Sequence, residues 1–284
     1  MGGGSWTKDD FTRYSKSVSR TVDASGSVIG NSSAQEMFTN TRLSAALNPK
    51  NVIRECRDSA EHPNTIPVIL ALDVTGSMGK TAVRVAQKLN VIMTNLYDRV
   101  QDIEFMIMGI GDLMCDSAPI QVSQFESDIR IAEQLDQIYF EGGGGGNMFE
   151  SYTAAWYFGS RHTMLDCWNR GKKGIIITIG DERINPYLPM TGRRCGLVSA
   201  TGDTLQEDIE TRSLYAEASD KFDIYHLDVI HGRRSDTGVK TSWMQYLDDR
   251  HFREVNLDSI ADEIVNIITG AQTSSVVAND GISW

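Results

Sequence analysis

The sequence has few of the features that mark secreted or membrane-spanning proteins. Its four cysteines lie far apart and form no Cys-x-x-Cys pair, which argues against a disulfide framework and against a thiolate zinc site. No apolar run approaches the ~18 residues needed to cross a bilayer, and the N-terminus lacks the apolar segment of a signal peptide. We therefore expect a soluble protein of the cytoplasm, with reduced thiols and no membrane partner.

Positive charge is also scarce. The 284 residues include 27 lysines and arginines against 38 aspartates and glutamates, a net charge of −11. Residues 1–60 carry 8 basic and 6 acidic side chains, which leaves 19 and 32 in the remainder. Because phosphate backbones are bound by clustered lysine and arginine, the acidic balance predicts no nucleic-acid partner.

Several catalytic motifs are missing as well. The five histidines show no metal-ligand spacing, and no His-Glu-x-x-His, Ser-His-Asp or paired-carboxylate pattern is found. The five consecutive glycines at 142–146 are not followed by Gly-Lys-Ser or Gly-Lys-Thr, so they form no nucleotide P-loop. We expect the histidines to be surface residues or hydrogen-bonded core residues.

The most informative stretch runs from Val68 to Gly79. An apolar run of strand length ends at Asp73 and continues through Thr75 and Ser77 into a helical pattern. In an extended chain, residues at i, i+2 and i+4 share one side, so these three polar side chains would converge before the helix begins. Convergent oxygen ligands at the carboxyl end of a buried parallel strand suit a hard divalent cation.

Later segments can add to such a site. Gly174 to Gly180 is a second buried apolar strand, and a carboxylate, Asp181, follows it directly. The glycine run at 142–146 is costly to order, so it is either a flexible connector or a close approach of the backbone. Asp112 and Asp116 follow a further strand, and we expect them to be solvated turn carboxylates rather than part of the site.

The pentapeptide Asp73-Val74-Thr75-Gly76-Ser77 resembles the Asp-x-Ser/Thr-x-Ser signature of the von Willebrand factor type A (vWA) domain. The metal-ion-dependent adhesion site (MIDAS) of that family carries Mg²⁺. The order of elements from about Pro67 to Ala271 also resembles the family, and Gly144-Gly145-Gly146-Asn147-Met148-Phe149-Glu150 resembles one version of its second loop, with Asn in place of Asp. The resemblance implies Mg²⁺, with Mn²⁺ or Ca²⁺ as substitutes, held by Asp73, Thr75, Ser77, Asn147 and Asp181, with Glu150 as a supporting acid.

Alternating strands and helices predict an α/β fold with a doubly wound, mostly parallel, Rossmann-like sheet and one short antiparallel edge strand near 119–125. The resemblance places a vWA domain at 63–271 and a polar tail at 272–284. Residues 1–62 read as a polar extension with a short helix near 50–59. We expect residues 1–45 to be disordered or draped over a partner surface, dispensable for folding and a means of self-assembly.

The resemblance implies a protein-protein interaction module, not an enzyme. Such an adaptor, or subunit of an intracellular assembly, would take an Asp or Glu of its partner on the Mg²⁺ ion. The alternative is a phosphotransferase or phosphatase of the haloacid dehalogenase type, with Asp73 as nucleophile and Asp181 on Mg²⁺. The pentapeptide also resembles the Asp-Lys-Thr-Gly-Thr phosphorylation motif of P-type ATPases, but Val74 stands at the position of its Lys. Thr75 replaces the second Asp of the soluble dehalogenase-type phosphatases. Both differences favour the binding module.

Overall fold

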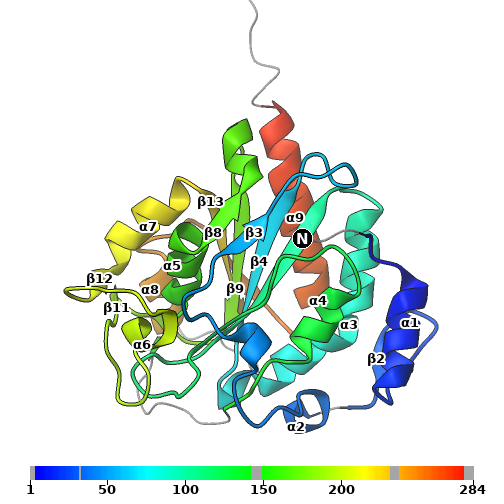
Figure 1. Ribbon diagram of the computed structural model, residues 1–284, viewed down its shortest axis with the longest axis horizontal. Helices are drawn as coiled ribbons and strands as arrows, with labels where there is room; N and C mark the ends of the chain where they lie inside the picture. The colour runs from blue at the N-terminus through cyan, green and yellow to red at the C-terminus, as the bar shows by residue number, and fades with distance from the viewer. Residues whose placement is uncertain (1–3, 32, 142–148, 231–236, 278–284) are drawn as a thin grey trace, which may run out of the picture.

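The computed structural model describes residues 4–31, 33–141, 149–230 and 237–277. Within these residues six strands form the main sheet, in the order β14-β13-β9-β4-β5-β6 (Figure 1). All pairings are parallel except that of β6 with β5 at one edge, so the predicted fold class is confirmed. The strands are β4 (Ile66–Asp73), β5 (Ile103–Ile110), β6 (Ile120–Val122), β9 (Gly174–Gly180), β13 (Phe222–Val229) and β14 (Phe252–Val255).

Both faces of the sheet are covered, which is why β4 is apolar along nearly its whole length. Val68 and Leu70 belong to the core on one face, while Ile69 and Ala71 belong to the core on the other. Figure 1 shows α3, α4 and α9 on one side of the sheet and α5, α7 and α8 on the other. The helices are α1 (Lys8–Ser17), α2 (Ala34–Met37), α3 (Gly79–Tyr97), α4 (Arg130–Leu135), α5 (Thr153–Arg161), α6 (Leu197–Thr201), α7 (Thr211–Ser219), α8 (Thr237–Trp243) and α9 (Ile260–Val277).

The strand order reverses beside β4. β5 follows β4 on one side, whereas β9 pairs with its other side, and Leu72 lies opposite Ile179 in that pairing. β4 ends at Asp73 and β9 at Gly180, so these two strand ends are neighbours. Open α/β sheets place their ligand sites at the carboxyl ends of strands at such a switch point.

Short elements surround the sheet. Short strand pairs and 3₁₀ turns tie the loops together, and none of the four cysteines, all of which are described, is in a disulfide. No helix in the described part of the chain is long and apolar enough to cross a membrane. The pairs are β1 (Thr21–Val22) with β2 (Val28–Ile29), β3 (Arg54–Cys56) with β8 (Thr163–Leu165), β7 (Phe149–Glu150) with β10 (Arg183–Ile184), and β11 (Tyr187–Leu188) with β12 (Ile209–Glu210); the turns are η1 (Ala45–Leu47), η2 (Gly76–Met78) and η3 (Asp166–Arg170).

The predicted helix near 50–59 is wrong. Arg54–Cys56 forms β3 instead, which pairs in parallel with β8, and the Arg54 guanidinium donates to the carbonyls of Ala46 and Val122. The predicted boundary of the C-terminal tail at residue 272 also shifts, because α9 continues to Val277. At 54–56, long-range strand pairing outweighs the local sequence pattern.

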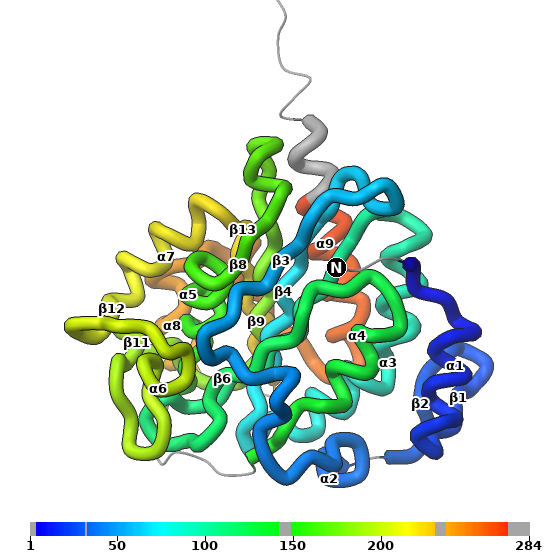
Figure 2. The backbone as a smooth tube through the Cα atoms, in the orientation of Figure 1, coloured from blue at the N-terminus to red at the C-terminus, as the bar shows by residue number. Residues whose placement is uncertain are grey.

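The N-terminal segment packs on its own chain. Trp6 and Phe11 are buried in the same core as α3, and the Trp6 indole N–H donates to Asn90 Oδ1 at 3.0 Å. The Arg20 guanidinium contacts both carboxylate oxygens of Asp136 at 2.8 and 2.7 Å. Figure 2 shows α1 and the β1–β2 pair beside α3. For described residues 4–31 and 33–45, the expectations of disorder, or of draping over a partner surface, are wrong.

This packing predicts that the segment is needed for stability. Trp6→Ala removes a buried indole and takes away the donor to Asn90 Oδ1, so the free energy of unfolding should fall by about 3–5 kcal/mol. Chemical denaturation would measure the change. Lys16→Ala, at an exposed position of α1, serves as control and should stay within about 0.5 kcal/mol of the parent. Equal stability of Trp6→Ala and the parent would restore the interpretation of a dispensable arm.

The buried carboxyl of Glu104 predicts a pH-dependent stability. Burial raises the pKa of Glu104 to about 7 from 4.5, against the opposing effects of a hydrogen bond with Cys56 and the charge of His62. The folded state therefore holds this proton more tightly than the unfolded chain. The resulting stability is complete below pH 4.5 and is lost as the pH rises through 7.

Glu104→Gln removes the ionisation and keeps the shape. We expect it to raise the free energy of unfolding by about 1–3 kcal/mol at pH 8 and to change it little near pH 4.5. Denaturation curves at both pH values would test this. Glu133→Gln on the exposed face of α4 is the control and should leave the pH profile of the parent unchanged. A Glu104→Gln profile identical to that of the parent would contradict the prediction.

Candidate metal centre

The end of β4 folds back on its own carboxylate. Asp73 is 1% exposed, and its Oδ1 accepts hydrogen bonds from the backbone N–H of Thr75 at 2.8 Å and from the Thr75 hydroxyl at 2.6 Å. A side chain that accepts from the backbone two residues later forms a local turn, which ends the strand and leads into η2. The two-residue spacing of Asp73 and Thr75 therefore allows the hydrogen bonds that hold Thr75 against the Asp73 carboxylate.

The loop after β4 also meets the loop after β9. The Ser77 hydroxyl donates to Asp181 Oδ1 at 3.1 Å. Burial raises the pKa of Asp73, and the charge of Asp181 raises it further, so the two carboxylates are close enough to repel each other. The structure thus brings together four of the predicted residues, Asp73, Thr75, Ser77 and Asp181. The fifth, Asn147, lies outside the described residues.

The oxygen atoms of these four side chains fit a small divalent cation as ligands. An ionised carboxylate can only accept, so the hydroxyls of Thr75 and Ser77 must use their protons on Asp73 and Asp181, which leaves their lone pairs for a metal. Mg²⁺ prefers oxygen ligands and needs few carboxylates. Among described residues no group of three or more His, Cys, Asp or Glu side chains is arranged to hold a metal. The candidate ligands form a different kind of set, because they are two carboxylates and two hydroxyls.

The start of α3 adds a favourable field. η2 leads directly into this helix of 19 residues, and its N-cap residue, Met78, makes no side-chain capping hydrogen bond. The first N–H groups of the helix and its positive dipole end therefore favour an anionic ligand at this edge of the sheet. A carboxylate that approaches the candidate centre would meet this field.

Tyr152 is a site residue that the sequence did not reveal. Its hydroxyl donates to Asp73 Oδ2 at 2.8 Å and accepts from the Glu182 backbone N–H at 3.2 Å. Its ring lies against Gly180, where an added Cβ would stand 2.0 Å from the tyrosine oxygen. A glycine at the end of an apolar strand, next to a candidate ligand, was the one available signal of such a close approach.

A layer of carboxyl groups lies near Asp73. The supporting acid Glu150 is buried, and its Oε2 has no hydrogen-bond partner among the described residues. Burial together with the charge of Asp73 raises the pKa of Glu150 far above its ordinary value. Asp112 and Asp116, expected to be solvated, are buried, and burial raises the pKa of Asp116 to about 6. Asp116 Oδ2 accepts from the Asp112 N–H at 2.8 Å, so these side chains belong to the loop architecture under the site.

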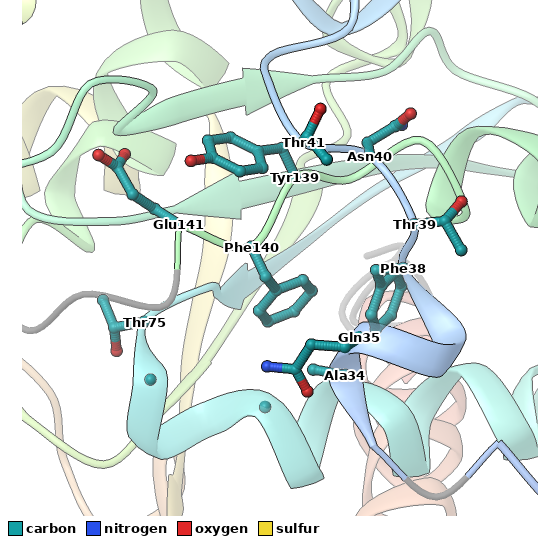
Figure 3. Close-up of a pocket in the computed structure, with 12 residues that line it drawn as sticks. Ala34, Gln35, Phe38, Thr39, Asn40, Thr41, Thr75, Tyr139, Phe140 and Glu141 are labelled. Carbon is teal, nitrogen blue, oxygen red and sulfur yellow. The ribbon is translucent and has the colours of Figure 1, made fainter.

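A groove adjoins the centre. It has a volume of about 480 Å³ and runs from the turn after β4 to α2 and the segment 139–141 (Figure 3). The rings of Phe38 and Phe140 face this hollow, with their centroids 4.6 Å apart, and Thr75 lies at one end. We call it the Phe38–Phe140 groove. Its lining is Ala34, Gln35, Phe38, Thr39, Asn40, Thr41, Thr75, Gly76, Gly79, Tyr139, Phe140 and Glu141.

Fold and site together define an α/β protein of the doubly wound class with oxygen ligands gathered at the switch point of its sheet. No protein-family model matches the sequence, and the comparison with curated proteins gives no match. Solved structures with a similar fold include the vWF domain of the type V pili tip protein Mfa5 from Porphyromonas gingivalis, at 12% identity and a TM-score of 0.44 over 78% of this chain and 98% of that chain.

Two further structures are similar at the same level. BatB, a conserved hypothetical protein from Bacteroides thetaiotaomicron, is 14% identical, with a TM-score of 0.44 over 73% of this chain and 99% of that chain. The pilus adhesin SpaC from Lactobacillus rhamnosus GG, in its open conformation, is 14% identical, with a TM-score of 0.45 over 81% of this chain. The match spans 31% of the SpaC chain. These are similarities of fold alone.

Proposed function

We propose that the protein is a binding module of the MIDAS type. In this proposal Asp73, Thr75, Ser77 and Asp181 hold a divalent cation, Mg²⁺ in the first place, and the ion takes an Asp or Glu side chain of a protein partner. The observation that carries the proposal is the pair of hydroxyl-carboxylate hydrogen bonds, Thr75 with Asp73 and Ser77 with Asp181, at the carboxyl ends of neighbouring strands.

The four proposed ligands differ in how deeply they are buried, and their roles in the proposal differ accordingly. Asp73 is buried, and the hydroxyls of Thr75 and Tyr152 donate hydrogen bonds to its two oxygens. Asp73 would therefore fix the position of the ion from the interior side of the site. Ser77 is exposed and Asp181 half-buried, so these two face an incoming ligand. Two of the four ligands are neutral hydroxyls, which leaves the bound ion attractive to a further carboxylate.

The same geometry supports binding over phosphoryl transfer. A nucleophilic carboxylate must be reached by a substrate as large as a phosphate ester, which is far larger than a metal ion, but Asp73 is 1% exposed. The residue after it is Val74, so no lysine of the ATPase motif is present to neutralise a phosphate. Asp73 therefore favours a structural and metal-holding role.

Titration of Mg²⁺ into the full chain, followed by isothermal calorimetry, tests the metal site. Ser77→Ala should weaken binding at least about tenfold, a change of about 1.4 kcal/mol. Ser213→Ala is the matched control, because it also removes an exposed serine that donates to an acid, Glu210, away from the site. Equal Mg²⁺ affinity of Ser77→Ala and Ser213→Ala would overturn the site assignment.

The partner part of the proposal needs a second measurement. Proteins retained from a cell extract on the immobilised chain should be lost in EDTA and in Ser77→Ala, and kept in Ser213→Ala. Added salt should matter less than EDTA, because a metal-carboxylate bond is screened less than exposed surface charge. Retention of the same proteins with and without EDTA would place the interface elsewhere.

A further inference from the structure

The chain leaves the described part of the fold far from the candidate metal centre. α9 follows β14, so it starts at the carboxyl edge of the sheet, where the centre lies, and it runs back along the strands. Its 18 residues span about 27 Å. Figure 1 shows the end of α9 at the opposite pole from α2 and the metal edge. Residues 278–284 follow Val277 in the sequence.

Those residues have an ordered pattern of side-chain types. In Ala278-Asn279-Asp280-Gly281-Ile282-Ser283-Trp284 an acid and two apolar side chains occupy three alternating positions, 280, 282 and 284. In an extended strand all three would point to one side, with about 7 Å between neighbours. The segment contains no other acidic and no basic residue, so Asp280 is its only charged side chain, and it is a carboxylate of the kind that a metal centre can bind.

The Phe38–Phe140 groove offers complementary features in the same order. Thr75, a candidate ligand, lies at one end, and the two phenylalanine rings follow along the hollow (Figure 3). The one acid of the lining, Glu141, is paired with the Arg194 guanidinium at 2.9 Å and accepts from the Ser117 N–H at 2.8 Å. A metal-bound carboxylate next to the groove would therefore meet little repulsion from it, and an apolar side chain would find an aromatic wall.

The distance that the C-terminal residues can span determines whether Asp280 binds the metal centre of its own chain or that of another copy. Asp280 is three residues beyond Val277, and three extended residues cover at most about 11 Å. The metal edge is about the length of α9, or about 27 Å, away. Asp280 therefore cannot reach the metal centre of its own chain, and a tail that binds such a centre must bind that of another copy.

We propose that the metal centre of one copy binds Asp280 of a second copy, with Ile282 and Trp284 of that copy in the Phe38–Phe140 groove. The inference rests on the proposed function, because it uses the same ion. Donor and acceptor lie at opposite poles, so the interface is head-to-tail and each added copy presents a fresh metal centre. The expected assemblies are linear chains that grow with protein concentration.

Sedimentation of the full chain in Mg²⁺ and in EDTA tests the proposal. The parent should form oligomers in Mg²⁺ whose mass rises with concentration, and monomers in EDTA. Asp280→Asn and Trp284→Ala should each weaken this association at least about tenfold. Asp220→Asn, an exposed acid at the end of α7, is the control and should assemble like the parent.

A mixing experiment distinguishes this interface from other contacts. Ser77→Ala keeps the tail but lacks a full metal centre, whereas Asp280→Asn keeps the centre but lacks the carboxylate. Each alone should stay monomeric in Mg²⁺, and their mixture should give dimers that grow no further. Oligomers of Asp280→Asn alone that match those of the parent would overturn the proposal.

Mg²⁺ titration separates this inference from the function on which it rests. If the parent binds Mg²⁺ and remains monomeric at all concentrations, the tail inference is wrong and the binding-module proposal stands. If the parent binds no Mg²⁺, the function itself fails. At protein concentrations at which the parent is monomeric, Asp280→Asn should bind Mg²⁺ with the affinity of the parent, since Asp280 cannot reach its own centre and no second copy supplies it.

Discussion

Asp73→Asn is expected to abolish the stabilisation of the fold by Mg²⁺. A ligand present at 100 times its dissociation constant stabilises the folded state by about 2.7 kcal/mol, so the parent should gain this amount and the variant close to nothing. In EDTA the order should reverse or vanish, because Asn removes the repulsion between Asp73 and Asp181 when no cation is present.

The choice of asparagine follows from the hydrogen bonds of this side chain. Asp73 accepts from the Thr75 backbone and hydroxyl and from Tyr152, so Asp73→Ala leaves three buried donors without an acceptor. Each such loss costs about 1–3 kcal/mol, and the alanine variant should be clearly less stable than the parent even in EDTA. Asparagine keeps the shape and one acceptor oxygen, which isolates the effect of charge.

Denaturant curves of the parent and both variants, in Mg²⁺ and in EDTA, measure these differences. The expected pattern is a Mg²⁺-dependent shift in the parent alone, with Asp73→Asn at least as stable as the parent in EDTA. A Mg²⁺ shift in Asp73→Asn equal to that in the parent would remove Asp73 from the metal centre.

The parts of the site that were predicted from sequence are those fixed by short-range geometry. Asp73 and Thr75 are two residues apart, and their contact follows from one local turn. The meeting of Ser77 with Asp181 spans 104 positions, yet it follows from the α/β pattern, which places consecutive parallel strands with their carboxyl ends at one edge.

The parts that were missed depend on packing that no local pattern encodes. Tyr152 reaches Asp73 because β7, just before it in the chain, pairs with β10 beside the end of β9. Asp112 and Asp116 look like ordinary turn residues, but the loop that carries them is folded inward. The segment at 54–56 becomes a strand because β8, more than a hundred residues later, supplies a pairing partner.

The N-terminal segment shows the same limit. Its polar composition suggested an arm without a core of its own, and that part of the reasoning holds, since Trp6 and Phe11 pack on α3 rather than on each other alone. What composition could not show is that this chain itself provides the surface. A few aromatics in a polar stretch indicate docking, but they do not identify the docking site.

Gly180→Ala is expected to be among the most damaging small substitutions in this chain. Gly180 ends β9, and its φ is not in the left-handed region, so alanine meets no backbone strain there. The conflict is with Tyr152, whose hydroxyl oxygen and two ring carbons would lie 2.0–2.4 Å from the new methyl group. The tyrosine cannot move freely, because its ring packs against Trp243 and His226 in the buried core.

Two costs therefore add. Overpacking of a core costs about 1–3 kcal/mol, and displacement of the Tyr152 hydroxyl leaves Asp73 Oδ2 without its donor, at about 1–3 kcal/mol more. We expect Gly180→Ala to lower the free energy of unfolding by about 2–6 kcal/mol and to weaken Mg²⁺ binding along with it. Gly270→Ala on α9 is the control: no atom of the described residues lies within 4 Å of its added Cβ, and alanine is the better helix former, so stability should be unchanged or slightly higher.

A double-mutant cycle identifies the cause. Tyr152→Ala removes the obstructing ring at a large cost of its own, but in that background Gly180→Ala has room for its methyl group. The second substitution should then cost at least about 1 kcal/mol less than it does in the parent. If Gly180→Ala costs the same with and without Tyr152, the contact between these two residues does not set the geometry under Asp73, and the destabilisation must come from the backbone of β9.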